Sequence, residues 1–340
     1  MTEVHTPASG SPLSGTDTQR STLGGGTQAT LTRVKDIGFW AEWAALVGLI
    51  VLVIVFQAAN STFLSTGNIE AMLTASAILI LLAVGQTFVI TTGGIDLSVA
   101  SVMTFAAVAF GLAYKHGGNL TLSCLVALLA GLAFGVVNGL LVSMGKITDF
   151  IATLGTLSAA SGAALIISNG KPTTVINATL LKLSSGGLGV LGWSFIIGAV
   201  VAVIAHVVYF RTRFGTHVLA TGGSVEAAAA TGIRTDRVKL AVYMIAGLLA
   251  GLAAILLVSR VGAAEPAANT AFLLNSVAAV VLGGVSLVGG RGSILGPVLG
   301  ALLLTALTNG LTLLGVSQFY QPLSVGVVVV LAALLSRFQK

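Results

Sequence analysis

The polar residues of this chain with the clearest spacing for chemistry lie in residues 91–98, where Asp96 follows Gly93 and Gly94 and precedes Ser98. A carboxylate there can cap the helix expected to begin near Ser98, because it accepts hydrogen bonds from free backbone N–H groups and opposes the positive pole of the helix. The functional alternative is a break in a helix that lines a path for a solute, since irregular backbone is tolerated within a membrane where it faces a cavity. The sequence leaves both interpretations open.

A second candidate group lies in residues 146–156, where Thr153 and Thr156 share one face of an expected helix. Hydroxyl groups on such a face can contact a polar solute as it crosses the membrane. Threonines in helices also bond back to their own backbone, which is the alternative interpretation.

The third candidate is the central loop, residues 211–239, a polar segment between two long apolar blocks. Its centre reads Glu226, Ala227 and Ala228, followed after three residues by Gly232, which predicts a short Ala-rich helix closed by a glycine. A second protein could hold such a helix, and energy would then enter the chain here. The alternative is an ordinary solvated connection.

The sequence lacks the residues or spacings that disulfide, nucleotide and metal chemistry require. The single cysteine, Cys124, permits no disulfide within the chain. The glycine-rich residues 275–300 fail the dinucleotide-binding spacing, and no G-x4-G-K-[ST] string is present for nucleotide hydrolysis. No metal-ligand spacing joins the four histidines, which are His5, His116, His206 and His217. We therefore expect no catalytic residue, metal site or cofactor in this polypeptide.

The composition is that of a multi-span helical membrane protein: 340 residues, mean hydropathy +1.03, 8% charged residues and 43 glycines. Helices of about 20 apolar residues can cross the hydrocarbon and satisfy their own backbone groups. The sequence predicts an all-α fold with about ten transmembrane helices, at residues 37–58, 69–90, 98–114, 120–144, 150–168, 188–210, 240–258, 271–287, 294–314 and 319–335.

Residues 1–35 are rich in Ser, Thr, Gly and Gln and are expected to form a disordered cytoplasmic tail, with residues 36–340 forming the membrane domain. With the N-terminus inside, twelve of the 16 Lys and Arg residues fall on the cytoplasmic side, together with both termini and the central loop. The other four are Lys115, Lys171, Lys182 and Arg260. We read the net charge of +6 as an orientation signal and expect no nucleic-acid partner.

Two features of the apolar blocks bear on mechanism. The string Asn-Gly-Leu recurs at residues 138–140 and 309–311, late in two spans that cross in opposite directions, as an inverted repeat would leave it; coincidence in so biased a composition is the alternative. Charged residues within the spans are almost absent, whereas ion-coupled carriers usually keep them there. The energy for any transport should therefore come from outside the chain.

Several strings together resemble the membrane-spanning permeases of bacterial ABC sugar importers of the ribose, xylose and galactose type, most closely the ribose type. The likeness covers about residues 42–336. It is carried by TGGIDLSVAS at 92–101, FIATLGT at 150–156, GGSVEAAAATGI at 222–233, VAAVVLGGVSLVGGRGSILGPVLGALLL at 277–304 and NGLTLLGVSQFYQ at 309–321.

The resemblance implies a non-catalytic transport subunit in the bacterial inner membrane. Two permease chains, expected to be identical, would pair around the path of a monosaccharide such as a ribose-like pentose or a hexose. Separate ATPase subunits would dock on the cytoplasmic side and a sugar-binding protein on the outside. By this likeness the helix at 226–232, with Arg234, couples the permease to the ATPase, and Phe150 and Asn275 join the candidate path residues named above.

The sequence departs from the family pattern in the central loop, where Ser224 replaces a usual Asn and Ala229, Ala230 and Thr231 replace a more polar string. Asn275 stands where relatives commonly have an acid. Two other functions remain as alternatives. A proton-coupled sugar carrier would lose uptake when an uncoupler is added at constant ATP, and a membrane scaffold or receptor would carry no solute.

Overall fold

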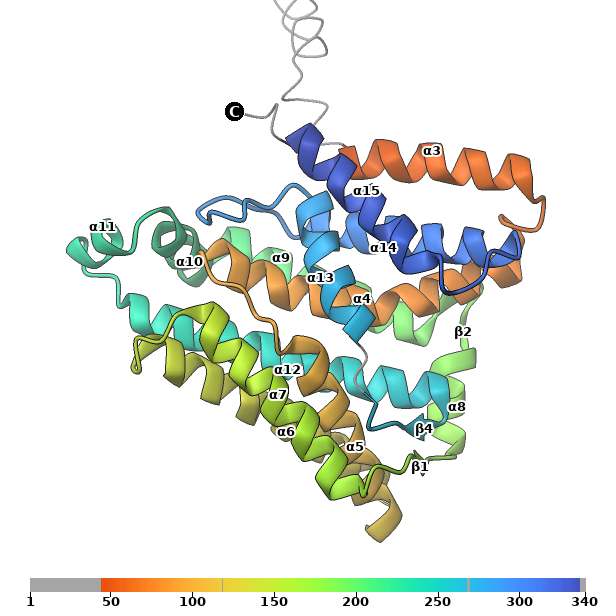
Figure 1. Ribbon diagram of the computed structural model, residues 1–340, viewed down its shortest axis with the longest axis horizontal. Helices are drawn as coiled ribbons and strands as arrows, with labels where there is room; N and C mark the ends of the chain where they lie inside the picture. Colours follow the sequence, from red (N-terminus) through yellow and green to blue (C-terminus); the bar gives the residue numbers. More distant parts are fainter. Residues whose placement is uncertain (1–43, 118, 268–269, 337–340) are drawn as a thin grey trace, which may run out of the picture.

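The computed structural model describes residues 44–117, 119–267 and 270–336, and these form a bundle of helices with very little sheet (Figure 1). The prediction of an all-α membrane protein is confirmed. The predicted tail, residues 1–35, lies outside the described residues. The helices are α3 (Ala44–Ala59), α4 (Thr66–Thr91), α5 (Val99–Gly117), α6 (Leu120–Ser143), α7 (Asp149–Ser168), α8 (Ala178–Ser185), α9 (Trp193–Arg211), α10 (Arg213–Gly223), α11 (Val225–Ala230), α12 (Thr235–Val261), α13 (Thr270–Leu282), α14 (Leu295–Leu313) and α15 (Gln321–Ser336).

Four two-residue strands complete the described elements. Strand β1 (Thr173–Thr174) pairs antiparallel with β4 (Ala263–Ala264), and β2 (Gly187–Leu188) pairs with β3 (Leu191–Gly192). The second pair occupies the start of the span predicted at 188–210, so the helix begins only at Trp193.

Each predicted span contains a helix, but the count of ten crossings is not confirmed. Among the described residues, seven helices are long and apolar enough to cross a membrane: α4, α5, α6, α7, α9, α12 and α14. The remaining three apolar helices, α3, α13 and α15, are shorter. Helix α13 ends at Leu282 rather than at the predicted residue 287, because Gly283 packs directly on the backbone of α14 at Gly296 and Gly284 adopts a φ of +75° that ends the helix.

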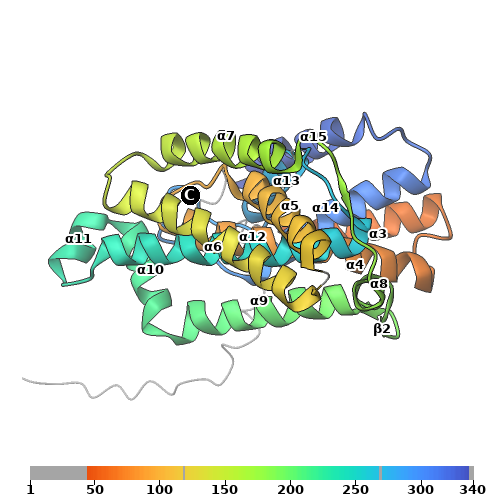
Figure 2. The same ribbon diagram turned by 90° about the horizontal axis from the view of Figure 1, so that it is seen from below.

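Two helices, α4 and α12, form the centre of the bundle. Helix α4 packs against α12, α9, α14 and α13, and α12 packs against α6 and α5 as well. In Figure 2, α7 lies along one edge of the molecule and α9 along the opposite edge, with α12 and α6 between them. The central helices are therefore covered by protein, while α6, α7 and α9 keep a broad apolar surface for lipid or another chain.

Helix α6 approaches α12 closely because both helices carry glycines at the contact. A Cβ on Gly131 or Gly135 would strike the backbone of α12, and one on Gly251 would lie 2.6 Å from the carbonyl oxygen of Ala127. Small residues of this kind let two helix backbones pack tightly. Such packing drives helices together in a membrane, where the hydrophobic effect does not.

Helices α4–α7 and α12–α15 pack in corresponding pairs. In this correspondence α4, α5, α6 and α7 match α12, α13, α14 and α15. The contact of α6 with α12 matches that of α14 with α4. The contacts of α5 with α6 and α7 match those of α13 with α14 and α15. This pattern is the one expected for an inverted repeat of the two groups of four. The repeated Asn-Gly-Leu strings lie near the ends of the corresponding helices α6 and α14. Their glycines make different contacts, since Gly139 packs on Leu240 and Gly310 packs on Phe56.

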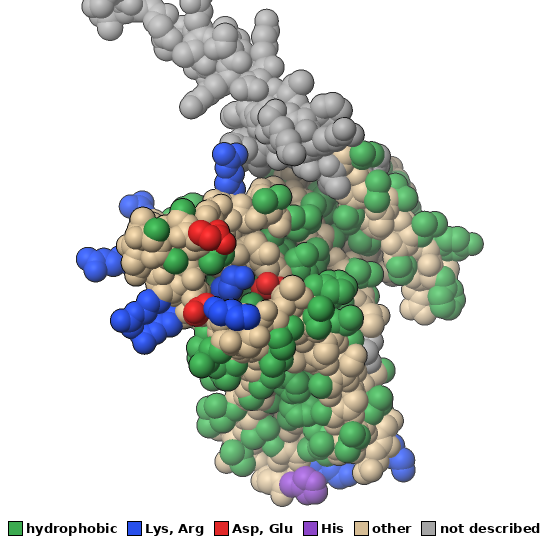
Figure 3. Space-filling view, turned by 60° about the vertical axis from the view of Figure 1, so that its left-hand side comes forward, with side chains coloured by type: hydrophobic (Ala, Val, Ile, Leu, Met, Phe, Trp, Pro, Cys, Tyr) green, Lys and Arg blue, Asp and Glu red, His purple; other side chains and the backbone are tan. Residues whose placement is uncertain are grey.

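The charged side chains gather at two ends of the molecule, with apolar side chains between them (Figure 3). Helices α10 and α11 lie at one end (Figure 1), and the hydrogen bond from Lys146 to Asp236 places the turn between α6 and α7 there as well. Lys115 and Arg260 occupy the last turns of α5 and α12, near the other end. This distribution fits a protein that crosses a membrane.

Candidate functional site

The helices are interrupted between α4 and α5, at residues 92–98, and the side chain of Asp96 makes hydrogen bonds within this helix break. Gly93 turns the chain with a φ of +80°, and Asp96 is only 3% exposed. Its Oδ1 accepts hydrogen bonds from the backbone N–H of Ser98 at 2.8 Å and from the Ser98 hydroxyl at 2.6 Å. Asp96 thus has the geometry of a residue that stabilises the start of α5.

Two further helices are tied to this break through side chains. Asn138 of α6 donates from Nδ2 to the Ser98 hydroxyl at 2.8 Å, and its Oδ1 accepts from the Thr156 hydroxyl of α7 at 2.6 Å. The Thr153 hydroxyl lies 3.2 Å from the carbonyl oxygen of Ile95. These side chains form a buried polar network that joins α5, α6 and α7. Sequence reasoning found each threonine but noted Asn138 only as part of the repeat.

Asp149, at the first residue of α7, was not selected from the sequence although it stands in the same polar stretch. Its Oδ1 accepts a hydrogen bond from the Tyr243 hydroxyl of α12 at 2.6 Å, and its Oδ2 lies 3.7 Å from Lys239 Nζ. A Cβ on Gly94 would lie 2.5 Å from Asp149 Oδ1. The carboxylate therefore joins the helix break to the first turns of α12, which follow the central loop.

The predicted Ala-rich helix of the central loop is present as α11. The Ser224 hydroxyl accepts a hydrogen bond from the Ala227 N–H at 3.1 Å and donates one to Glu226 Oε2 at 3.2 Å, which satisfies the helix start. At the other end Gly232 has a φ of +87°, and the N–H of Ile233 bonds to the carbonyl of Ala228. Helix α11 projects from the end of the bundle (Figure 1).

The side chains of α11 divide into an outer and an inner face. Glu226 and Ala227 are exposed, whereas Ala228 is 4% exposed and packs inward. A second helix, α10, precedes α11 and was not predicted; Thr212 caps its start, with the hydroxyl 3.4 Å from the N–H of Gly215. The central loop is therefore a compact structured unit.

A glycine junction, formed by Gly93, Gly222, Gly289 and Gly290, connects the central loop to the helix break. The N–H of Gly290 donates to the carbonyl of Thr91, the last residue of α4, at 2.9 Å. A Cβ on Gly222 would strike that same carbonyl, and one on Gly289 would lie 2.9 Å from the nitrogen of Gly93. Three segments far apart in the sequence thus meet backbone to backbone, which only glycine permits.

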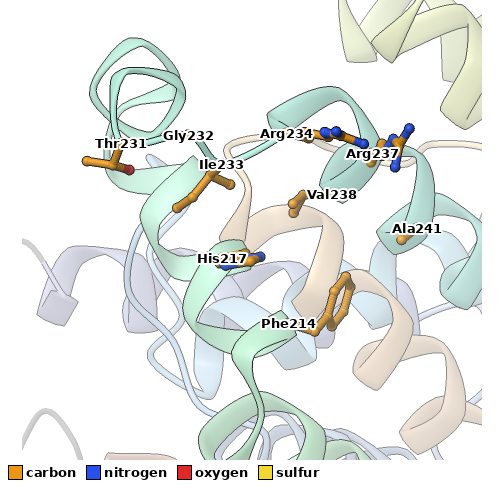
Figure 4. Close-up of a pocket in the computed structure, with 9 residues that line it drawn as sticks. All are labelled: Phe214, His217, Thr231, Gly232, Ile233, Arg234, Arg237, Val238 and Ala241. Carbon is orange, nitrogen blue, oxygen red and sulfur yellow. The ribbon is translucent and has the colours of Figure 1, made fainter.

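The remaining predicted residues lie elsewhere. Phe150 is 57% exposed on the outer side of α7, and Asn275 lies half-buried on α13, outside the polar network. Arg234 lines an open pocket of about 460 Å³ between α10 and the start of α12 (Figure 4). Within the described ranges, no three His, Cys, Asp or Glu side chains group as metal ligands would.

Residues 68–335 match a family described as "Branched-chain amino acid transport system / permease component". The chain belongs to this permease family. It is 38% identical to the ribose import permease protein RbsC of Bacillus subtilis (strain 168), over 91% of this chain and 97% of that one. It is also 38% identical to RbsC of Escherichia coli (strain K12), over 86% and 93% of the two chains.

A relative with another named solute is the autoinducer 2 import system permease protein LsrC of Photorhabdus luminescens, which is 33% identical over 84% of this chain and 87% of its own length. No solved structure matches the chain significantly. The resemblance to ribose-type permeases is confirmed by these relatives, and with it the expectation of a multi-pass permease subunit.

Proposed function

We propose that this chain forms the translocation path of an ABC importer for ribose or a similar monosaccharide, with ATP hydrolysed by a separate subunit. The observation that carries the proposal is the 38% identity that extends over 97% of a ribose import permease. Two features of the chain support the division of labour: its sequence has no P-loop, and α11 presents an exposed face at one end of the bundle.

The ATPase subunit would dock on the outward face of α11, at Glu226 and Ala227. Ala228 and Gly232 would hold the helix in place, since one packs inward and the other closes it. Arg234, which the family resemblance also assigned to this coupling, is exposed just beyond α11 and lines the pocket. We infer that this end of the bundle, with the N- and C-terminal segments, faces the cytoplasm of a bacterial cell and that a sugar-binding protein docks at the opposite end.

Movement of α11 would reach the membrane interior through two contacts. The glycine junction joins the end of α10 to Thr91 and Gly93, and Asp149 joins the first turns of α12 to Gly94. Both contacts end on the break that Asp96 organises. Because tightly packed backbones transmit a displacement with little loss, we propose that the break switches between two arrangements during transport.

The path itself would form between two identical chains. The polar network of Asp96, Ser98, Thr153 and Thr156 is buried within one chain, whereas Phe150 is exposed and Asn275 half-exposed. We infer that the surfaces of α7 and α13 that carry Phe150 and Asn275 face the partner copy and the solute. The buried network would hold these helices in place.

Uptake of labelled solutes by cells that express the chain with its ATPase and binding protein tests the proposal. We expect ribose or another monosaccharide to be taken up and excess unlabelled monosaccharide to compete. The relationship to LsrC makes a sugar-like signal the second candidate solute, and saturable uptake of autoinducer 2 without competition by any monosaccharide would favour it. Uptake of a branched-chain amino acid alone would contradict both.

A further inference from the structure

The pocket beside α11 combines a cationic rim with an apolar floor (Figure 4). Two arginines, Arg234 and Arg237, stand at the start of α12, and His217 of α10 lies across from them. The apolar residues of the lining are Phe214, Ile233, Val238 and Ala241. This lining is complementary to a ligand that carries negative charge at one end and hydrocarbon at the other.

The arginines have no carboxylate partner among the described residues. The two ion pairs found there use other cations: Asp236 pairs with Lys146 at 2.6 Å and Asp149 with Lys239 at 3.7 Å. Glu226 accepts a hydrogen bond from Ser224. Arg234 and Arg237 are both exposed, so two full positive charges at this pocket remain uncompensated within this part of the chain.

In the proposed orientation, the pocket lies at the depth where lipid headgroups meet hydrocarbon. Helix α9 ends at Arg211 and the apolar run of α12 begins at Leu240, so the proposed membrane boundary lies close to these two residues. Ala241 lies seven residues after Arg234, which at 1.5 Å per residue places it about 10 Å deeper along α12. The cationic rim is thus at headgroup level and the floor continues into the spanning helix.

We propose that this pocket binds an anionic phospholipid, with its phosphate between Arg234 and Arg237 and the first part of an acyl chain over Phe214 and Val238. Arginine holds phosphate through charge-assisted, often bidentate hydrogen bonds, and basic pockets at helix ends are suited to anionic headgroups. An acidic protein segment would match the charge of the rim but would lack the hydrocarbon chain that matches the apolar floor. Since Thr231 and Gly232 also line the pocket, the bound lipid would hold the end of α11 close to the membrane surface.

The test uses the full-length chain without partner proteins, in nanodiscs of phosphatidylcholine that also contain phosphatidylglycerol, an anionic lipid that attracts basic side chains. The lipid that stays bound after transfer to neutral detergent is counted by native mass spectrometry. The double variant Arg234→Gln/Arg237→Gln should retain phosphatidylglycerol at least about tenfold less well than the unaltered chain, a loss of about 1.4 kcal/mol in binding free energy. The matched control is Arg211→Gln/Arg213→Gln, which removes the same charge from exposed residues outside the pocket and should retain the lipid.

A second variant separates the floor from the rim. Ala241→Phe fills the half-buried floor and leaves both arginines in place, so it should also lose the lipid, whereas Arg234→Lys/Arg237→Lys should keep most of it. Equal retention by the chain and both double Gln variants would overturn the proposal. Displacement of the lipid by millimolar inorganic phosphate would assign the pocket to a free anion instead. If Arg234→Gln/Arg237→Gln kept the lipid but lost the ATPase subunit in a separate co-purification, the arginines would be assigned to a protein partner, and the proposed function would stay intact.

Discussion

The Asp96 carboxylate stabilises the helix break between α4 and α5 through its hydrogen bonds. Its Oδ1 accepts two hydrogen bonds from Ser98, whose hydroxyl in turn accepts one from Asn138. In a low-dielectric interior each of these groups would be costly to leave without a partner. The residue therefore stabilises the local structure, whatever part the break has in transport.

Replacing Asp96 tests this role. Asp96→Ala leaves the Ser98 N–H and hydroxyl without an acceptor and should lower the free energy of unfolding by about 1–3 kcal/mol, the usual cost of an unsatisfied buried group. Asp96→Asn keeps an acceptor oxygen and should lose less than half as much. Thermal unfolding of the purified variants in detergent measures both. Stability and uptake at the level of the unaltered chain in Asp96→Ala would remove Asp96 from the account.

The glycine junction makes a sharper prediction about coupling. A methyl group on Gly222 meets the carbonyl of Thr91, so Gly222→Ala must push the central loop away from the break. Strain of about 1.4 kcal/mol in one of two alternating states changes a rate about tenfold, and we expect ATP-driven uptake to fall at least that far.

Gly223→Ala is the matched control for that substitution. A methyl group on this neighbouring, exposed glycine would meet no atom within 4 Å outside its chain neighbours and its own helix, so uptake should be near that of the unaltered chain. Membrane insertion is checked for both variants by expression level. If Gly222→Ala and Gly223→Ala transported equally well, the junction could not transmit the movement.

At the scale of elements, the short helix α11 is the proposed docking site of the ATPase subunit. It is closed by Ser224 at one end and Gly232 at the other, and it packs on the rest of the chain through Ala228. Its six residues are too few to be stable alone, so its neighbours α10 and α12 must hold it in place. This arrangement leaves the outer face free for a partner.

A bulky residue on the outer face should block docking without disturbing the fold. We predict that Ala227→Trp loses most co-purification with the ATPase subunit, because the added ring projects from an exposed position of α11. Thr216→Trp, at an exposed position of α10, serves as control and should keep the subunit. Full co-purification with Ala227→Trp would place the docking surface elsewhere.

At the scale of the whole molecule, the charged ends define how the chain sits in a membrane. The proposed orientation puts α10 and α11 in the cytoplasm and α8 outside. Helix α9 connects these two ends, and its 19 residues span about 28 Å at 1.5 Å per residue, close to the thickness of the hydrocarbon.

Cysteine labelling in whole cells tests the orientation. With Cys124 replaced by Ser, a cysteine at exposed Lys182 should react with a membrane-impermeant maleimide, and one at exposed Arg213 should react only after the cells are opened. The reverse pattern would invert the proposed orientation. Labelling of both positions in intact cells would mean that α9 does not cross the membrane.

The sequence predicted the helical class, a helix within each predicted span and the short helix of the central loop, because apolar runs and capping residues act locally; the count of ten membrane crossings is not confirmed. It did not reveal Asp149, Tyr243 or Asn138 as partners of the break, since those contacts join residues up to 94 positions apart. The span predicted at 271–287 also runs past Leu282, where α13 ends, because only the packing of Gly283 on α14 shows where the helix must stop. Local chemistry was thus readable from the sequence, while the contacts that carry the proposed coupling were not.

The central claim is that this chain has no energy source of its own and moves solute only when a separate ATPase acts on it. Uptake of labelled ribose into proteoliposomes measures this directly, with the purified chain reconstituted alone or with its ATPase and binding protein. We predict accumulation only in the complete system with ATP, unchanged by a protonophore. Accumulation by the chain alone under an imposed proton gradient would contradict the account.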